Sequence, residues 1–306
     1  MTVSSAISSP PLPRDEPEGF VLIDGVEMYR IPDFDRLPPF LIAVTSESDL
    51  WMYASSAGGV TAGRIDADHA IFPYETVDRL HDSYGIASPQ TLLRVSRSDR
   101  PTVLWEPLAI QARSAFITRN LYKSPLGNRL MFEEIHHQLR LTFRYCWSTS
   151  TRFGFVRTAR LTNNDDEVPA RIEMLDGLLN ILPAGVGLSM QQTLSSLVDA
   201  YKQSEIDPET GLAMYCLTSL VSDRPEPAEA LTTNTVWSRG LEGAAIFLRD
   251  DVRRTTVDPS TMASMSVRRK HSSAWRGVST MGSFSLKLVL STIGTPVNAS
   301  NSLMRR

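Results

Sequence analysis

Most of the chain between residues 20 and 250 has apolar positions that alternate with polar ones or run in short stretches bounded by turn residues. The stretch FVLIDGVEMYRI surrounds an Asp24-Gly25 pair, which is typical of a tight β-hairpin when it lies between two apolar runs. PFLIAVTSESDLWMYASS likewise places two β-type runs on either side of residues 46–49. Runs rich in β-branched and aromatic residues then continue to Ile181: TLLRVS, TVLWEPL, SAFITRNLY, RLMFEEI and LRLTFRYCWSTSTRFGFVRTARLTN. This pattern predicts strands joined by turns.

One segment, SMQQTLSSLVDAYKQSEI, departs from the strand pattern. Ser189 can cap a helix there, and apolar residues follow at helical spacing: Met190, Leu194, Leu197, Val198 and Tyr201. Strand-like runs resume with LAMYCLTSLV and LTTNTVW. Because the regular strand and helix alternation of a doubly wound sheet is missing, the sequence predicts a mainly all-β fold. We expect a large antiparallel β-sandwich over residues 20–250 with one short embedded helix.

The two ends of the chain have a different composition. Residues 1–19 are rich in Pro, Ser and charge, so we expect them to be disordered. Residues 251–306 carry 9 Lys or Arg and 2 Asp or Glu, and within them only SFSLKLVLSTI resembles a strand. We expect either a basic, mostly disordered tail or a segment that reflects a shifted reading frame or an early-terminated fragment, and contact with nucleic acid or membrane is a further alternative.

Charge and composition exclude several classes of protein. The first 250 residues carry 22 Lys or Arg against 32 Asp or Glu, and an acidic body disfavours nucleic acid as a partner. The N-terminus has neither a basic start nor an apolar stretch typical of a signal peptide, and no apolar run approaches a membrane span. The expected location is therefore the cytoplasm, without membrane contact.

Common catalytic motifs are absent from the sequence. It contains no phosphate-binding loop, no GxGxxG, no GxSxG and no HExxH. Cys146 and Cys216 lack the spacing of a zinc site, which predicts two buried thiols. Two adjacent pairs, His136 with His137 and Glu133 with Glu134, should face opposite sides of a strand, so neither pair can share one metal or one substrate.

A polar cluster follows two adjacent glycines in SSAGGVTAGRIDADHAIFPYET, residues 55–76. Sugars are bound by directed hydrogen bonds to their hydroxyls and by flat aromatic faces against their C–H surfaces. The cluster therefore predicts a carbohydrate-binding set consisting of Gly58, Gly59, Arg64, Asp66, Asp68, His69 and Tyr74. Stacking faces could come from Trp51, Tyr53, Phe72 and Tyr74. The alternative is a long hairpin loop stabilised by Asp–Arg pairs, with no ligand.

Carboxylates in this region allow two other interpretations. Asp66-Ala-Asp68 fits the short DxD pattern with which glycosyltransferases bind a divalent metal, and His69 could add a ligand. A glycosidase would need two carboxylates roughly 5 to 10 Å apart. Residues distant in sequence could converge to form such a pair, namely Asp66, Glu134, Asp176 and Glu226. We expect no metal and no cofactor.

Three stretches carry a resemblance to a known family: FLIAVTSESDLWMYASSAGGVTAGR, FGFVRTARLTNNDDEVPARIEMLDGLLNIL and LVSDRPEPAEALTTNTVW. They resemble the N-terminal domain of the cellobiose phosphorylase and cyclic glucan synthase group, over about residues 20 to 245. This resemblance implies a β-supersandwich of the galactose-mutarotase-like type, in which Gly58 and Gly59 match the glycines of a loop directed toward the sugar. The family's loop has an Asn-containing triplet where this sequence has Ser55-Ser56-Ala57.

The resemblance also implies that sugar binding and catalysis belong to different domains. In that family the catalytic carboxylate lies in a following helical barrel, which this chain lacks. The leading hypothesis is therefore a sugar-facing accessory domain that binds an oligosaccharide or glucan and does not catalyse a reaction alone. Its partner would be a helical catalytic domain or a second copy of the chain. The alternatives are a structural or dimerisation module without a sugar ligand, and the metal-dependent glycosyltransferase.

Overall fold

The computed structural model describes residues 17–110, 114–219, 232–239, 243–247, 273–280 and 284–294. All strand pairings in these residues are antiparallel, and they form three sheets. The mainly β fold predicted from the sequence is thus confirmed.

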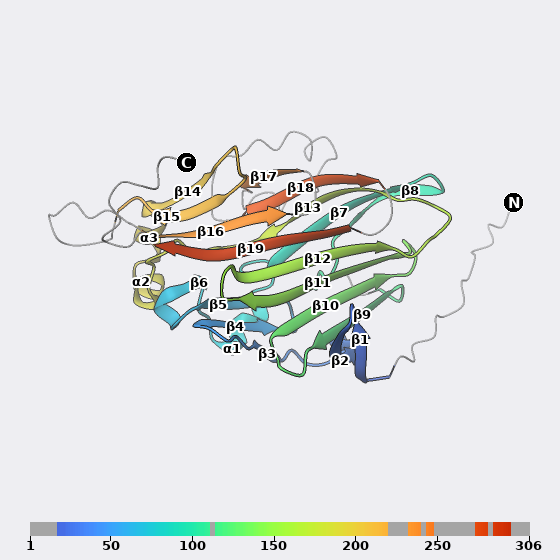
Figure 1. The fold of residues 1–306 in the computed structure, drawn as a ribbon, viewed down its shortest axis with the longest axis horizontal. Helices are drawn as coiled ribbons and strands as arrows, with labels where there is room; N and C mark the ends of the chain where they lie inside the picture. Colours follow the sequence, from blue (N-terminus) through green and yellow to red (C-terminus); the bar gives the residue numbers. More distant parts are fainter. Residues whose placement is uncertain are drawn as a thin grey trace, which may run out of the picture.

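The largest sheet has ten strands and forms the front layer in Figure 1. Its strands, in spatial order, are β1 (Gly19–Ile23), β2 (Val26–Pro32), β9 (Ile117–Lys123), β10 (Arg129–His136), β11 (Leu141–Ser150), β12 (Gly154–Asn163), β19 (Phe284–Gly294), β16 (Thr232–Arg239), β15 (Ala213–Leu217) and β14 (Lys202–Ile206).

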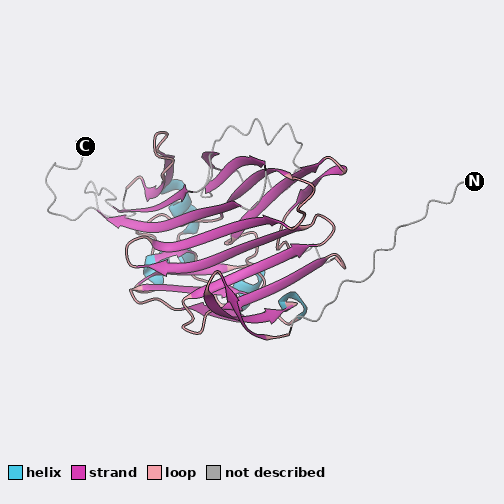
Figure 2. Cartoon of the chain, turned by 45° about the vertical axis from the view of Figure 1, so that its right-hand side comes forward, coloured by secondary structure: helices cyan, strands magenta, loops and turns pink. Residues whose placement is uncertain are grey.

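Two smaller sheets lie behind it. A five-stranded sheet contains β17 (Gly243–Phe247), β18 (Ser273–Thr280), β13 (Arg171–Leu178), β7 (Pro89–Arg97) and β8 (Arg100–Trp105). A four-stranded sheet contains β3 (Leu41–Val44), β4 (Leu50–Ser55), β5 (Val60–Arg64) and β6 (Ala70–Phe72). Figure 2 shows the same arrangement turned by 45°, with the antiparallel strands of the large sheet aligned side by side across the molecule.

One hydrophobic core joins the three sheets. It includes Trp147 from the ten-stranded sheet, Leu93 and Met174 from the five-stranded sheet, and Met52 and Ile71 from the four-stranded sheet. Strand β7 shows most clearly why the sheets share a core, because every second residue of PQTLLRVSR is buried. Side chains alternate between the two faces of a strand, so this pattern places one face of each sheet against the core.

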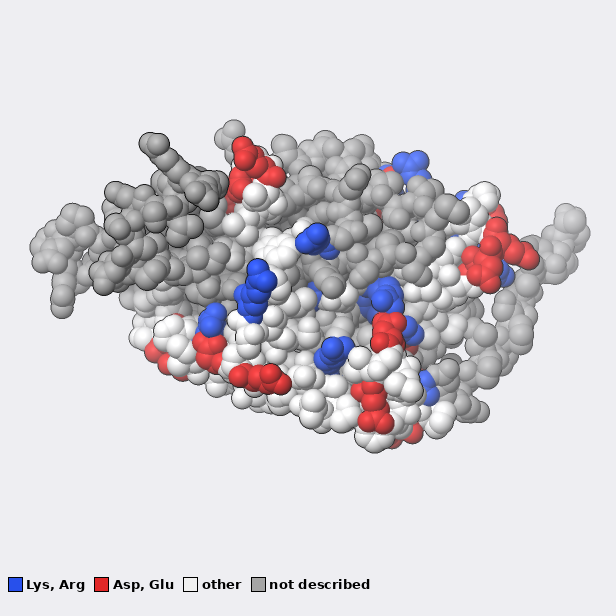
Figure 3. Space-filling view, in the orientation of Figure 1, with Lys and Arg blue, Asp and Glu red and all other residues white. Residues whose placement is uncertain are grey.

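The hairpin β1–β2 packs on the outer face of the large sheet. Asp24 and Gly25 both have positive φ, 50° and 77°, as the predicted tight turn requires. Met28 of the hairpin is buried against Tyr122 and Met131 on that face. Figure 3 shows this side of the molecule, where basic and acidic side chains are interspersed.

Adjacent pairs in the sequence face opposite directions, as predicted. Glu133 lies toward the outer face and accepts hydrogen bonds from Asn120 (2.8 Å) and Tyr122 (2.7 Å), whereas Glu134 lies in the interior beside Trp105 (2.7 Å). His136 contacts the ring of Trp105, with ring centroids 5.5 Å apart, and His137 Nε2 is 2.8 Å from the Thr118 hydroxyl. The two histidines therefore serve separate packing contacts.

The helices differ from the expectation in number and position. The predicted helix at Ser189 is two short helices, α2 (Leu188–Thr193) and α3 (Ser195–Tyr201), and its N-cap is Gly187. Val198 is buried as expected, but Leu194 and Leu197 are exposed, because a break at Leu194 ends the single apolar stripe. The sequence did not predict three further elements: α1 (Val77–Asp82), η1 (Phe34–Arg36) and η2 (Ala67–His69).

Two strands lie in the segment for which a tail was expected. SFSLKLVLSTI forms most of β19, which pairs with β12 on one side and β16 on the other. Residues 273–280 form β18, which pairs with β13 and β17. A disordered tail does not describe these two strands, because they occupy positions inside the sheets. The other residues of 251–306, and residues 1–16, lie outside the described part of the chain, so the domain boundaries stay a prediction.

Within the described residues, no helix is both long and apolar enough to cross a membrane. Cys146 and Cys216 are free and half-buried, and burial raises the pKa of the Cys146 thiol to about 11.

Candidate functional site

The residues predicted to bind a sugar lie at the two ends of one hairpin. Gly58 and Gly59 form the turn between β4 and β5, whereas Arg64 ends β5 and Asp66, Asp68, His69 and Tyr74 follow it. Five residues of extended strand, at roughly 3.3 Å each, separate the two groups by roughly 17 Å. One sugar ring cannot contact both groups, so the structure divides the predicted set in two.

Close packing explains the two glycines. A Cβ atom on Gly59 would lie 2.1 Å from the Ser83 hydroxyl and 2.2 Å from the Leu80 carbonyl oxygen. Gly58 has a φ of 97°, and its Cβ would lie 2.7 Å from the ring of Tyr84. The turn therefore fits against the end of α1 only without side chains.

The polar residues beyond β5 form short-range contacts at the surface. Arg64 donates two hydrogen bonds to Asp49, both of 2.9 Å, and this holds the pKa of that carboxyl below its ordinary value. Asp66 Oδ1 accepts from the Asp68 backbone N–H (3.0 Å) and lies 2.7 Å from His69 Nδ1. The contact with His69 is the main cause that lowers the pKa of Asp66.

Asp68 stabilises a different element. Its Oδ1 accepts a hydrogen bond of 2.7 Å from the backbone N–H of Leu188, the first residue of α2. An acidic side chain at this position satisfies one of the free N–H groups of the helix. Asp66 and Asp68 are thus each used in local structure. Among the described residues, no cluster of three or more His, Cys, Asp or Glu side chains could hold a metal ion. The geometry gives no support to the DxD interpretation.

Three aromatic rings lie next to these polar groups, and we call Trp51, Tyr53 and Tyr74 the aromatic platform. The ring of Trp51 is 6.2 Å from that of Tyr53 and 5.7 Å from that of Tyr74, measured between centroids. Tyr53 is 38% exposed and Tyr74 is 42% exposed, and Trp51 is partly exposed. The planes of Trp51 and Tyr53 are 37° apart and those of Trp51 and Tyr74 are 78° apart, so the three partly exposed rings are adjacent but do not form one flat surface.

The platform is held in place by two contacts of Trp51. Its Nε1 donates to the Asp66 carbonyl oxygen (3.1 Å), and its ring covers Gly63, where a Cβ would lie 2.6 Å from Trp51 Cζ2. Trp51 and Tyr53 are two residues apart on β4 and so share a face. Phe72, which the sequence also offered as a stacking face, is fully buried and contacts Trp147 in the core. That expectation is wrong, because β6 turns this side chain inward.

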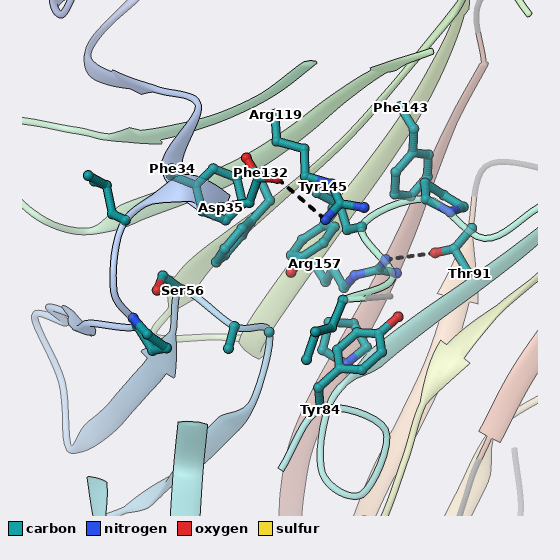
Figure 4. A pocket seen from close by; sticks show the side chains of 18 residues that line it. Phe34, Asp35, Ser56, Tyr84, Thr91, Arg119, Phe132, Phe143, Tyr145 and Arg157 are labelled. Atoms are coloured by element: carbon teal, nitrogen blue, oxygen red, sulfur yellow. Dashed lines mark hydrogen bonds and ion pairs between the residues drawn. The ribbon is translucent and has the colours of Figure 1, made fainter. Parts of the chain in front are cut away.

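A pocket of about 130 Å³ lies inside the sandwich, close to the Gly58 turn (Figure 4). Its lining comes from the inner face of β9–β12, the start of β7, the loops around η1 and Leu108, the turn at residues 56–58 and Tyr84. Five aromatic side chains contribute to the lining, namely Phe34, Tyr84, Phe132, Phe143 and Tyr145. Of the residues predicted from the sequence, only Gly58 lines this pocket, because the other lining residues are dispersed along the chain between positions 34 and 157.

Two buried arginines stand at the wall of this pocket, each with a carboxylate partner. Arg119 Nε donates to Glu134 (2.8 Å) from the neighbouring strand, where the two residues are directly opposed. Arg157 donates to Asp176 (2.6 Å) across the interior, from the large sheet to the five-stranded sheet. Each carboxylate is 0% exposed, and pairing is what makes such burial tolerable.

These contacts exclude the carboxylates from glycosidase chemistry. Glu134 also accepts from Trp105 Nε1 (2.7 Å) and the Leu108 backbone N–H (2.6 Å), and Asp176 also accepts from the Thr91 hydroxyl. Both carboxyl groups are therefore occupied by fixed donors, and Asp66 lies at the far surface. Glu226 lies outside the described residues.

No protein-family model and no curated protein matches the chain. Among solved structures, the chain is similar to a bacterial glucoamylase complexed with acarbose, at a TM-score of 0.32 and 8% sequence identity. The match covers 92% of this chain and 36% of the glucoamylase chain, so this chain spans about a third of that protein's length. At these values the similarity carries no argument about activity.

Proposed function

We propose that this protein is a carbohydrate-binding β-sandwich that holds an oligosaccharide on the aromatic platform. The observation that carries the proposal is the platform itself, in which the partly exposed rings of Trp51, Tyr53 and Tyr74 lie next to one another beside directed polar groups. A pyranose ring has apolar C–H faces and equatorial hydroxyls, and it matches a surface of this kind. Glucans and β-linked oligosaccharides are the substrate class that fits, since their sugar units repeat along an extended chain.

In the proposal, polar side chains next to the platform form directed hydrogen bonds with the hydroxyls of the sugar. Arg64 and Asp49 form a planar pair at the surface, and Asp66 with His69 forms a second pair. All four side chains are between a third and three fifths exposed, so their remaining donors and acceptors can reach a ligand. Of the predicted residues, Arg64, Asp66, His69 and Tyr74 belong to this site in the proposal, and Gly58 and Gly59 do not. Asp68 supports it through α2.

In this proposal the chain binds a sugar without converting it. The two buried carboxylates that sequence analysis considered for catalysis are paired with arginines in the interior. A catalytic partner domain or a second copy of the chain would perform any reaction.

Calorimetric titration with cello- and laminari-oligosaccharides tests the proposal. We expect binding in the millimolar range or tighter for the unmodified protein, and loss of at least tenfold in affinity for Tyr53→Ala combined with Tyr74→Ala, because stacking faces are removed. Trp237→Ala is the matched control, since this partly buried Trp contacts Phe153 elsewhere in the molecule. No binding heat from the unmodified protein, or an equal loss in the control, would contradict sugar binding at the platform.

A second candidate function rests on the same surface. Exposed apolar side chains lie near the platform, among them Leu41, Ile65 and Val77, and a surface of this type also suits packing against another protein. The candidate is a structural module that pairs with a second copy. Analytical ultracentrifugation distinguishes the two: a dimer that dissociates on Tyr53→Ala with Tyr74→Ala and ignores sugars favours the structural module.

A further inference from the structure

The pocket near Leu108 is separate from the aromatic platform and differs from it in chemistry. We propose that it is a second binding site, for a small neutral molecule that has one planar apolar ring and an oxygen acceptor. The inference does not depend on sugar binding at the platform, because no residue is common to the two sites.

The volume and the lining of the pocket indicate that the ligand has one planar apolar ring. A cavity of about 130 Å³ is close in size to cavities of about 150 Å³ that bind benzene in other proteins. Phe34, Phe132 and Phe143 contribute apolar side chains to the lining, and Tyr84 and Tyr145 add two further rings. A sugar has a hydroxyl on most carbons and needs a polar partner for each. The aromatic lining therefore favours a planar apolar ring over a sugar.

Two hydrogen-bond donors at the pocket wall indicate that the ligand carries an oxygen acceptor. Arg157 is 1% exposed, and its NH1 and NH2 atoms are held by Asp176 (2.6 Å) and Thr91 (3.2 Å), but its buried Nε has no hydrogen-bond partner. Its guanidinium lies 4.6 Å from the ring centroid of Tyr145. Tyr145 lines the same pocket, and its hydroxyl is the second donor that the proposal uses. An orphaned buried donor costs free energy, and a bound oxygen acceptor would remove that cost.

The charged side chains around the pocket favour a neutral ligand. Arg119 and Arg157 contribute two positive charges, and Glu134 and Asp176 balance them within 2.8 Å. Asp35, which also lines the pocket, has a carboxylate oxygen 3.9 Å from Arg119 NH1. The ionised side chains of the pocket lining, taken together with the paired carboxylates Glu134 and Asp176 behind them, therefore sum to a small negative charge, which opposes an anionic ligand.

The backbone at the pocket shows one unusual conformation. Leu108 has a φ of 65°, a left-handed value that is unfavourable for a bulky side chain. The hydrogen bond of 2.6 Å from its N–H to Glu134 fixes it there, with its side chain at the pocket. Strained residues of this kind cluster at ligand sites, where the surrounding structure holds them.

Three probes with the same ring test the proposal: benzamide, benzoate and toluene. Benzamide supplies a neutral oxygen acceptor, benzoate an anionic one and toluene none. Ligand-observed NMR or calorimetry on the full chain should show benzamide binding about tenfold tighter than either of the others, the effect of one good hydrogen bond without an added charge. Equal or tighter binding of toluene or benzoate, or no binding of any probe at millimolar concentration, would overturn the proposal.

Variants locate the binding in the pocket. Tyr145→Phe removes one hydroxyl and keeps the ring, and it should weaken benzamide several-fold while leaving toluene unchanged. Ala57→Leu should weaken both probes because it fills the pocket from the Gly58 turn. Ala200→Leu on the exposed side of α3 is the matched control for added volume. If Tyr145→Phe has no effect on benzamide, the acceptor assignment is wrong, and this conservative variant gives that answer even where Ala57→Leu does not fold. Tyr53→Ala with Tyr74→Ala should leave benzamide binding intact, which separates failure of this site from failure of the platform.

Discussion

The aromatic platform and the internal pocket use similar residues under opposite conditions. Both combine aromatic rings with arginine and carboxylate pairs, but Arg64 and Asp49 are each about a third exposed, whereas Arg157 and Asp176 are essentially buried. Exposed ion pairs are screened by water and contribute about 0 to 1 kcal/mol, while a buried pair that loses one member leaves an uncompensated charge. An ion pair between arginine and a carboxylate can therefore be broken at little cost at the surface, whereas the same pair inside the sandwich stabilises the fold.

The largest difference between the two environments should appear at two neighbouring aromatic residues. Phe72→Ala removes a fully buried ring from the core and should lower the free energy of unfolding by about 3 to 5 kcal/mol, through lost burial and the remaining cavity. Tyr74→Ala, two residues later at the surface, should change it by less than about 0.5 kcal/mol. Urea denaturation of both variants measures the contrast. A similar loss for both would mean that the platform is part of the core.

The buried ion pair gives the next largest effect. Asp176→Asn leaves the charge of Arg157 unpaired in the interior and should cost about 3 kcal/mol, at the lower end for such pairs because the amide oxygen still accepts a hydrogen bond. Combining it with Arg157→Met removes that charge and should restore part of the stability. The measurement is a double-mutant cycle by denaturant unfolding. If the double variant is as unstable as the sum of the single ones, the two residues are not coupled.

The surface pair should give the smallest effect, and it depends on pH. Asp49 has a pKa below its ordinary value of 3.8, chiefly because of the hydrogen bonds from Arg64. Its contribution is therefore fully present above about pH 4 and is lost as the pH falls through the folded-state pKa. Asp49→Asn should lower the unfolding free energy by less than about 1 kcal/mol at pH 7, and the difference from the unmodified protein should disappear toward pH 2.

A pH series of urea titrations on the two proteins checks this prediction. Arg64→Lys is a useful control, because lysine keeps the charge and loses the two parallel hydrogen bonds of the guanidinium. A difference that grows as the pH falls would contradict the sign, since it would require a carboxyl whose pKa is raised on folding.

Local signals in the sequence were sufficient for the sheets and for part of the surface site. The Asp24-Gly25 turn, the alternation in β7 and the apolar run of β19 each predicted the element that formed. The turn and β7 did so because turn chemistry and the two-residue period of a strand depend on neighbouring residues alone, whereas the run of β19 was strand-like within a segment for which a tail was expected. Trp51, Tyr53 and Tyr74 were identified by the same route, since the two residues on β4 alternate with buried ones.

Other features depended on pairing across the molecule. Residues 273–280 read as a polar stretch and become β18 only because β13 and β17 offer edges on either side. The helix break at Leu194 and the inward turn of Phe72 also have no local signal, because the neighbouring elements decide which face of each is covered. The division of the predicted sugar site followed from the length of β5, which places Gly58 and Arg64 at opposite ends.

The sequence by itself determined the β-sandwich class, the main hairpins and the existence of a polar and aromatic surface after β5. Only the tertiary structure decided which aromatic rings face solvent and which carboxylates meet arginines. It also brought together the pocket of Tyr84, Tyr145 and Arg157 from strands far apart in the chain. The physical reason is that hydrophobic alternation specifies the two faces of a strand, while the partner of a buried side chain is set by the packing of one sheet on another.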